Sequence, residues 1–523
     1  MSGENLNSSL FILKIMLIFA DKMYNNTNKG RFIIMKYITV EEFANKVGLS
    51  ARSVRNYCAQ GRIAGATLSG KTWMIPESSG KPARINSNEI DIEASKYGED
   101  LINFINNSPV SFVAVKNVAG LLLSNGYKEI TEKEDYKYKR GDKVFIVRND
   151  TTLIALNIGS NPVLENGYHV IAAHSDSPCF KIKPVSEGKT DIYNKVNIAP
   201  YGGLNAPSFL DRPLGAAGRI IYEKNGELIH QVIDFKDLTV FIPNICVHFN
   251  REVNNGYAYD MSVDMQAFIS SDGASFLEAI AKRLKVRTED ISNYDLYLYN
   301  KQSGMIWGEN NEFISSPRLD DLECVYTSTR AFVESSNEDA INVLYIADNE
   351  EVGSISRQGA DSDFLKSILV NVSNDLSLNY YRVIANSFLI SADNAHAVHP
   401  NKPGLTDNDN KVYMNKGIAI KFNASNSYTS DGVSSSIFQK ICKNASVPYQ
   451  FFNNKSGMRS GSTLGNVLLS QVSLPSVDIG LPQLAMHSSY ETAGTIDIKY
   501  AIKAFKEFYS SDIFVDKGKI EIK

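Results

Sequence analysis

The sequence predicts an α/β protein in which helices cover both faces of a mixed, largely parallel sheet. Two observations predict this class. Short apolar runs recur after about residue 90 with helical patterns between them, and each run ends in a cluster of polar residues. Buried strands that alternate with helices form parallel sheets covered on both faces, and ligands bind beyond the carboxyl ends of such strands. We therefore expect a functional site where the polar clusters meet.

Composition places the chain among ordinary globular proteins. Its 523 residues allow about two to four compact units, and its 43% hydrophobic and 21% charged residues exclude a disordered or fibrous chain. The net charge of −4 gives no whole-chain argument for nucleic acid, although a small basic domain could lie within it. The five cysteines are scattered without a CxxC pair, which argues against a disulfide framework or a thiolate zinc site. Reduced cysteines predict a cytoplasmic protein.

We interpret residues 1–34 as an optional leader that need not be ordered. The apolar run "SLFILKIMLIFA", from Ser9 to Ala20, is broken by Lys14 and is shorter than the roughly 20 residues of a membrane span. The following "DKMYNNTNKG" offers no small-residue cleavage site for a signal peptide. We therefore expect no membrane segment, and Met35 is a second candidate start.

Residues 35–78 have the pattern of a small winged helix-turn-helix domain. Thr39, followed three residues later by Glu42, predicts a capping box at the start of an apolar-faced helix, which Gly48 ends. Ser50 caps a second helix, "ARSVRNYCAQ", and "GRIAGATLSGKTWMIP" predicts a small hairpin. Two short helices around a glycine turn are the layout of a helix-turn-helix.

The second of these helices exposes Arg52, Arg55 and Asn56, which are candidate DNA-binding residues. The domain resembles the excisionase-type winged helix-turn-helix domain over about forty residues. A small packing or protein-binding module is the alternative. Residues 79–89, within "PESSGKPARINSNE", are rich in Pro, Gly, Ser and charge and predict a linker.

Four apolar runs carry the polar clusters. The first, "YHVIAAHSDSP", extends from Tyr168 to Pro178, and "NVLYIADNEEVGS" follows far downstream. The third, "NSFLISADNAHAVHPN", covers residues 386–401, and the fourth, "SLPSVDIGLPQLAMHSSYETAG", covers residues 473–494. Patterns such as "DGVSSSIFQKICKNA" predict helices between them.

Histidines gather in these clusters. Of the seven in the chain, four lie there: His174, His396, His399 and His487. A single histidine is more often a core or surface residue than a ligand, but four coincidences favour a metal site. In "HSD", Asp176 follows His174 by two residues, so its carboxylate can accept a hydrogen bond from the ring nitrogen that faces away from a metal.

Acidic residues crowd the end of the second run. "ADNEEVGS" places Asp348, Glu350 and Glu351 close together, and adjacent carboxylates repel unless a cation is near or one of them is protonated. Ligands drawn from Asp, Glu and His suit zinc, manganese or cobalt. One glutamate can ligate the metal while its neighbour accepts a proton from water. An ordinary solvated turn is the alternative.

Six motifs extend this interpretation: "AAHSDSP", "SPRLDDL", "DNEEVGS", "SADNAHAVHPN", "GSTLG" and "LAMHSSYE". They occur in the order and approximate spacing of the M18 metallopeptidases, and the chain from about residue 90 to its C-terminus resembles this aspartyl aminopeptidase family. The resemblance implies a zinc-aminopeptidase-like catalytic domain of residues 90–179 and 311–523. It also implies an inserted β-rich dimerisation domain, residues 180–310, and a homo-oligomer, a tetrahedral dodecamer built from dimers.

The resemblance further implies a site for two divalent metal ions, normally zinc. By position, His174 and Asp393 would hold one ion, Glu351 and His487 would hold the other, and Asp320 would bridge the two. Two such ions share a water, lower its pKa and polarise the scissile carbonyl.

Other roles are implied in the same way. Glu350 would be the general base, and Asp176 would orient the first histidine ligand. His248, in "IPNICVHFNREVN", matches a histidine that reaches into the neighbouring subunit's active site to stabilise the oxyanion. Lys421 matches a lysine near the substrate's acidic side chain, and His396 would lie beside the ligands in the substrate site.

The leading hypothesis is a metal-dependent aminopeptidase that hydrolyses the N-terminal residue of peptides, with Asp and Glu favoured. One alternative is a transcriptional regulator that uses the peptidase fold as a sensor or oligomerisation body. Because a sensor has no need of Glu350 beside five ligands, the residue set favours an enzyme. Another two-metal peptidase or a deacylase is a third hypothesis, which "RLDD" and "AHAVHPN" disfavour. We therefore expect an active enzyme with an appended nucleic-acid-binding or scaffolding domain.

Overall fold

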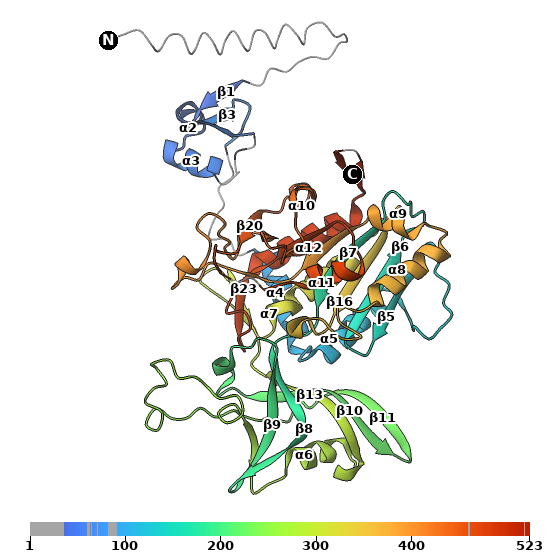
Figure 1. The fold of residues 1–523 in the computed structure, drawn as a ribbon. Coiled ribbons are helices and arrows are strands. Elements are labelled where there is room, and N and C mark those ends of the chain that lie inside the picture. The colour runs from blue at the N-terminus through green and yellow to red at the C-terminus, as the bar shows by residue number, and fades with distance from the viewer. Residues whose placement is uncertain are drawn as a thin grey trace. The chain divides into compact units, whose positions relative to one another are not determined.

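The computed structural model describes residues 36–59, 63, 65–70, 72–81, 91–458, 461–516 and 518–523. The chain divides into two compact units, residues 1–88 and residues 89–523 (Figure 1). The leader predicted over residues 1–34, and most of the predicted linker, lie outside the described residues.

The first unit is a small winged helix-turn-helix fold. The Thr39 hydroxyl accepts the Glu42 N–H at 3.3 Å, and the Glu42 carboxylate accepts the Thr39 N–H at 2.8 Å, so the predicted capping box is confirmed. Gly48, at φ +66°, ends the first helix in the left-handed region that glycine tolerates. The elements are β1 (Tyr37–Thr39), α2 (Val40–Val47), α3 (Ala51–Ala59), β2 (Thr67–Ser69) and β3 (Thr72–Pro76), with the strands in the order β1-β3-β2.

A nine-stranded sheet forms the centre of the second unit, in the order β20-β19-β21-β17-β7-β16-β6-β5-β4. Five of its eight pairings are parallel, which confirms the prediction of a mixed, largely parallel sheet. β7 lies between two parallel neighbours, β16 and β17. The strands are β4 (Lys128–Ile130), β5 (Lys143–Arg148), β6 (Thr152–Ile158), β7 (Tyr168–His174), β16 (Ile341–Ala347), β17 (Phe388–Ala392), β19 (Ile418–Phe422), β20 (Tyr449–Asn453) and β21 (Ser476–Gly480).

Helices cover both faces of this sheet because its central strands are apolar on both sides. Ile171 and Leu344 pack into one core, whereas Val170 and Val343, one position earlier on the same strands, pack into the other. The first core is covered by α4 (Ile92–Asn106), α5 (Ser111–Ser124), α7 (Leu319–Val333), α10 (Gly432–Asn444) and α12 (Thr495–Ser510). The second is covered by α8 (Phe364–Asp375), α9 (Tyr380–Ala385) and α11 (Leu464–Gln471).

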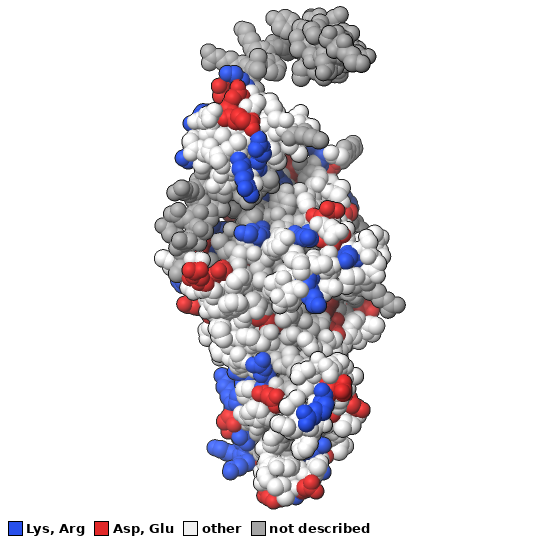
Figure 2. Space-filling view, turned by 90° about the vertical axis from the view of Figure 1, so that its left-hand side faces the viewer, with Lys and Arg blue, Asp and Glu red and all other residues white. Residues whose placement is uncertain are grey.

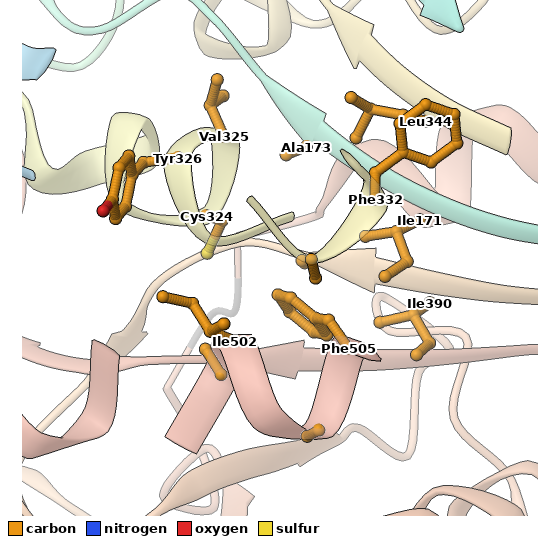
Figure 3. Close-up of a cluster of buried hydrophobic side chains, with 14 of the residues drawn as sticks. Ile171, Ala173, Cys324, Val325, Tyr326, Phe332, Leu344, Ile390, Ile502 and Phe505 are labelled. Atoms are coloured by element: carbon orange, nitrogen blue, oxygen red, sulfur yellow. The ribbon is translucent and has the colours of Figure 1, made fainter. Parts of the chain in front are cut away.

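One helix, α7, packs against both the sheet and a second helix. Figure 3 shows Phe332 of α7 beside Leu344 of the sheet, and Phe505 of α12 between α12 and α7. Phe332, Leu344 and Phe505 are fully buried. The packing fixes the position of the first turn of α7, which carries Asp320.

A second, antiparallel sheet of six strands is inserted between β7 and β16, in the order β11-β10-β13-β8-β9-β12, and it has its own apolar core. Its elements are β8 (Cys179–Thr190), β9 (Tyr193–Tyr201), η1 (Ala206–Phe209), β10 (Leu214–Lys224), β11 (Glu227–Asp234), β12 (Ala267–Ser271), α6 (Phe276–Leu284), η2 (Thr288–Asp290) and β13 (Ile291–Asn300).

Short strands complete the unit. β14, which falls within the range predicted for the insertion, pairs instead with β15 in a sheet of order β14-β15-β23-β22-β18. These are β14 (Met305–Trp307), β15 (Phe313–Ser316), β18 (Ala395–His396), β22 (Pro482–Leu484) and β23 (Glu491–Gly494), and the remaining elements are η3 (Glu350–Val352), η4 (Pro403–Leu405), β24 (Ile513–Asp516) and β25 (Lys519–Ile522).

The surface carries mixed charge. On the face shown in Figure 2, acidic and basic side chains are interspersed, so this face presents no extended field of one sign. Among the described residues, no helix is long and apolar enough to cross a membrane.

The packing of α7 against α12 leads to a prediction about stability. Replacing Phe505 with alanine removes a fully buried ring from between α12 and α7, which we expect to lower the free energy of unfolding by about 3–5 kcal/mol. Leu123→Ala, at a position on α5 that is 54% exposed, is the control and should change it by less than about 0.5 kcal/mol. Urea unfolding followed by tryptophan fluorescence measures both, and equal midpoints would contradict the packing described.

Candidate metal centre

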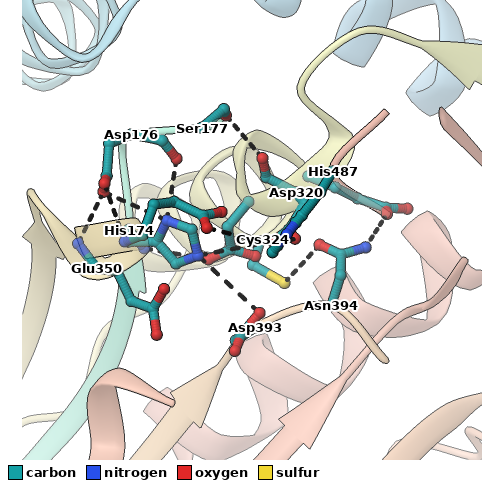
Figure 4. Close-up of polar contacts among 12 residues, drawn as sticks. His174, Asp176, Ser177, Asp320, Cys324, Glu350, Asp393, Asn394 and His487 are labelled. Carbon is teal, nitrogen blue, oxygen red and sulfur yellow. Dashed lines mark hydrogen bonds and ion pairs between the residues drawn. The ribbon is translucent and has the colours of Figure 1, made fainter. Parts of the chain in front are cut away.

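Strand ends of the central sheet bring histidine and acidic side chains together. β7 ends at His174, and its parallel neighbours β16 and β17 lead directly into polar turns at the same edge of the sheet. The start of α7 and the turn between β22 and β23 reach this edge as well. Six acidic and histidine side chains line one cavity there: His174, Asp320, Glu350, Glu351, Asp393 and His487. Figure 4 labels all of them except Glu351.

Asp320 lies between two sets of these side chains. Its Oδ1 is 3.6 Å from Nε2 of His174, which is 4.0 Å from Oδ1 of Asp393. Its Oδ2 is 3.3 Å from Nε2 of His487, which is 3.4 Å from Oε2 of Glu351. One carboxylate therefore faces two separate groups with its two oxygens.

These side chains fit divalent metal ions. Two ligand atoms of one tetrahedral zinc ion, each 2.0–2.1 Å from it, lie about 3.3 Å apart, which is close to the separations of 3.3–4.0 Å observed here. Oδ1 of Asp320 and Oε1 of Glu351 are buried, and neither has a hydrogen-bond partner among the described residues. Buried carboxylate oxygens without partners are costly, and a cation would satisfy them.

Crowding of like charges shifts the pKa values of the acids. Burial, together with the nearby carboxylates, raises the pKa of Glu350 to about 8, and burial beside Asp320 also raises the pKa of Glu351. Burial alone would raise the pKa of Asp320 too, but the neighbouring His174 and His487 rings outweigh it and lower that pKa. Carboxylates packed this closely require either protons or a cation.

Asp176 organises the turn that carries the paired glutamates. Its two carboxylate oxygens accept the N–H groups of Glu350 and Glu351 at 3.2 and 3.1 Å. The predicted hydrogen bond from the His174 ring to this carboxylate is replaced by one to the main-chain oxygen of Asp176: Nδ1 lies 3.0 Å from that oxygen and 3.5 Å from the carboxylate. Because a carbonyl only accepts, Nδ1 carries the proton and Nε2 of His174 is left free to bind a metal.

The Glu350 carboxylate is placed differently from the others. It forms no hydrogen bond or ion pair with another residue of the described part of the chain, and in Figure 4 only its main-chain nitrogen makes a drawn contact. It lines the same cavity of about 300 Å³ as the other five side chains. A carboxylate that faces this cavity without a partner is positioned to exchange a proton with a bound molecule.

Lys421 and His396, the two residues proposed for substrate binding, line the same cavity. The Lys421 ammonium is buried, 3.4 Å from Oδ2 of Asp393 and 5.6 Å from the centre of the Tyr428 ring. Burial alone would lower the pKa of Lys421, but the Asp393 carboxylate outweighs it and raises that pKa. The cavity therefore contains a permanent positive charge. His396 is solvent-exposed, and its ring lies at the cavity wall.

Four residues proposed from the sequence are not among those that line this cavity. His248 is exposed in the segment between β11 and β12 and does not line it. Arg52, Arg55 and Asn56 are exposed on α3 of the first unit. Arg55 is already paired with Glu41, at 2.5 Å.

Two acids that support the centre were not assigned a role from the sequence. Oδ2 of Asp321 accepts the N–H of His174 at 3.1 Å. The fully buried Glu491 accepts the N–H of His487 at 2.7 Å with one oxygen and that of Asp320 at 3.1 Å with the other. Both acids stand in the quoted motifs "RLDD" and "SSYE", but spacing along the chain does not show that a side chain turns back to a distant main-chain group.

Two family models match the chain. "Aminopeptidase I zinc metalloprotease (M18)" matches residues 104–509, and "Helix-turn-helix domain" matches residues 37–79. A relative from Clostridium novyi (strain NT), named "Probable M18 family aminopeptidase 2", is 41% identical over 429 residues, which cover 79% of this chain and 99% of the relative.

Solved structures are also similar to this chain. The complex of Ape4 and Nbr1 matches with a TM-score of 0.77 and 30% identity, over 80% of this chain and 86% of that chain. The mApe1 dodecamer of S. cerevisiae matches with a TM-score of 0.71 and 28% identity, over 80% of this chain and 97% of that chain. With the family model, the relative and the metal-ligand cluster in agreement, the chain belongs to the M18 family of zinc metalloaminopeptidases and carries a helix-turn-helix domain in addition.

Proposed function

We propose that this chain is a two-metal aminopeptidase that hydrolyses the N-terminal residue of peptides and prefers Asp or Glu there. The position of Asp320 carries the proposal of two ions, because its two oxygens face two separate sets of ligand atoms. His174 and Asp393 would hold one ion, Glu351 and His487 the other, with Asp320 shared. Zinc is the metal that the family description names, and manganese and cobalt accept the same donor atoms.

Metal ions bound here would polarise the scissile carbonyl and make water a better nucleophile. The proton transfers are carried out by the chain's own residues. The Glu350 carboxylate, which forms no hydrogen bond or ion pair within the described chain, accepts the proton of the attacking water and delivers it to the leaving amine. The Asp176 carboxylate accepts the main-chain N–H groups of Glu350 and Glu351 and so fixes the backbone from which the two side chains take their different roles.

A preference for acidic N-terminal residues would come from Lys421. Its ammonium is buried at the cavity wall, where it can form a charge-assisted hydrogen bond with a substrate carboxylate. The exposed His396 ring, on the same wall, supplies a further donor or acceptor for the substrate. A neutral side chain would leave the Lys421 charge without this partner, which costs binding energy.

The related S. cerevisiae protein is described as a dodecamer, and we propose that this chain also forms a homo-oligomer through its inserted six-stranded domain. The segment around His248 supports this. It exposes Ile245, Val247 and Phe249, the last of them 88% exposed, and apolar side chains of this kind are usually covered by a partner. His248 would then reach the active site of the neighbouring subunit.

A second function, DNA binding by the first unit, is supported by the exposed side chains of α3. Arg52 and Asn56 lie on one side of this helix, free of ion pairs within the described chain, which is where a recognition helix carries its base and phosphate contacts. In this case DNA binding would hold the enzyme at particular sites on DNA, or the chain would act as a transcriptional regulator. The five free cysteines are consistent with a reducing compartment such as the cytoplasm.

Metal and substrate dependence can be measured on the purified protein. We expect two divalent ions per chain and faster hydrolysis of Asp- and Glu-para-nitroanilide than of the Leu derivative, with all activity lost on chelation and restored by zinc. Elemental analysis and absorbance kinetics provide the two measurements. Fewer than two ions with no hydrolysis of any of the three substrates would refute the proposal.

The division of roles between the paired glutamates is testable by substitution. Glu350→Gln should lower kcat about 10²- to 10⁴-fold with metal content unchanged, because it removes a base but no ligand. Glu351→Gln should lose metal as well as activity. Glu165→Gln, at an exposed position, is the matched control and should resemble the wild type. Loss of metal in Glu350→Gln would contradict these assignments.

DNA binding can be tested on the full chain. Arg52→Ala should weaken binding to duplex DNA and reduce the slope of log affinity against log salt by about one, because one phosphate contact is lost. Lys96→Ala, an exposed lysine on α4, removes the same charge elsewhere and should leave the slope unchanged. If the two variants have the same salt dependence, the helix-turn-helix domain does not bind DNA through α3.

A further inference from the structure

The last residue of β9 and the loop after it leave the inserted sheet and reach the metal centre. This segment, residues 201–205, connects β9 to η1 and reads Tyr-Gly-Gly-Leu-Asn. It contacts the centre at three points, through the main chain of Gly203 and Asn205, the backbone position of Gly202 and the hydroxyl of Tyr201.

The first contact fixes His487. Nδ1 of its ring lies 3.1 Å from the carbonyl oxygen of Gly203, and its own carbonyl accepts the Asn205 N–H at 2.8 Å. Since the Gly203 carbonyl can only accept, Nδ1 must carry a proton, so Nε2, which faces Asp320 and Glu351, is the nitrogen available to a metal. Two hydrogen bonds from the inserted domain thus set both the tautomer and the position of this histidine.

The second contact places Gly202 against Glu351. Gly202 has φ +74°, and a Cβ added there would lie 3.0 Å from Cβ and 3.5 Å from Oε2 of Glu351. Any side chain at this position would therefore push Glu351 away, in addition to straining the backbone. The glycine lets the loop pass directly behind a carboxylate of the centre.

The third contact supports the turn that carries Glu351. The Tyr201 hydroxyl donates to Oδ2 of Asp176 at 2.8 Å and accepts from the Asn349 side chain at 2.9 Å. The same Asp176 oxygen accepts the Glu351 N–H at 3.1 Å. Tyr201 thus links the inserted sheet to the turn through one shared carboxylate.

We infer that residues 201–205 of the inserted domain are a positioning element for the half of the metal centre formed by Glu351 and His487. The inference rests on the proposed metal-binding role of these two residues. The insertion would then be part of the machinery that binds metal, in addition to any part it takes in assembly. Partners that orient metal ligands in this way typically contribute about 10- to 100-fold to metal affinity.

Gly202→Ala tests the inference, with Gly226→Ala as its matched control. Gly226 lies in the turn between β10 and β11 of the same domain at φ +80°, and a Cβ there would meet nothing within 4 Å. Both substitutions therefore carry the same backbone strain, but only the first approaches a metal ligand. The full-length proteins are stripped of metal, and zinc affinity is measured by competition with a chromophoric chelator.

We expect Gly202→Ala to bind one zinc ion at least about 10-fold more weakly than the wild type, whereas Gly226→Ala keeps the wild-type affinities. Both metal-free variants should melt below the metal-free wild type, because both carry the backbone strain. Equal zinc affinities in the two variants would overturn the inference. A wild type that binds one ion would contradict the proposal of two ions, but the inference would still be judged on the weakening of that ion.

Tyr201→Phe provides a second test if Gly202→Ala does not fold. It removes only the hydroxyl on Asp176, and we expect zinc affinity to fall about 10-fold. Tyr222→Phe is its control, because that hydroxyl bonds to Gln231 at 3.0 Å on the outer strands of the insertion. Zinc affinity that is unchanged in Tyr201→Phe, or lowered equally in both variants, would count against the positioning role.

Discussion

The arrangement of this enzyme depends on one electrostatic constraint: several carboxylates converge at a buried strand edge, where they repel one another. Two histidines lower the pKa of Asp320 and so stabilise its negative charge. They do not remove the repulsion among the other carboxylates, because the pKa values of Glu350 and Glu351 stay raised. Such a cluster is stable with protons or with a cation. The orphaned oxygens of Asp320 and Glu351 favour the cation, which agrees with the family to which the chain belongs.

The surrounding fold holds these charges in place with main-chain hydrogen bonds and close packing. Glu491 joins the chain segments of Asp320 and His487, and Asp176 joins the segment of His174 to the paired glutamates. Behind them, α7 packs against both the sheet and α12, which leaves little freedom for Asp320. Asp320, Glu350 and Glu351 are therefore each held from behind, through the main-chain N–H group, by an acid that does not line the cavity.

Local signals in the sequence were sufficient for the fold class and for most of the residues that meet at the cavity. Each apolar run is directly followed by its polar cluster in the sequence, so both can be recognised locally. Parallel strands then place their carboxyl ends at the same edge of the sheet, which brings the clusters together. The antiparallel placement of β6 and the separate sheet of β14 were not predicted, because strand direction depends on distant partners. For the same reason the main-chain bond of His174, the role of Glu491 and the contacts of Tyr201 could not be foreseen. The roles assigned to individual site residues remain predictions.

The position of the insertion between β7 and β16 has a consequence for synthesis of the protein. β7 forms hydrogen bonds with β16 and β17, which leave the ribosome only after the whole six-stranded domain has been made. The strands of the insertion pair only with one another, so it can fold while the apolar β7 still waits for its partners. Nascent chains that stall in this interval would expose a fully buried strand, which is the state most prone to aggregate and most in need of a chaperone.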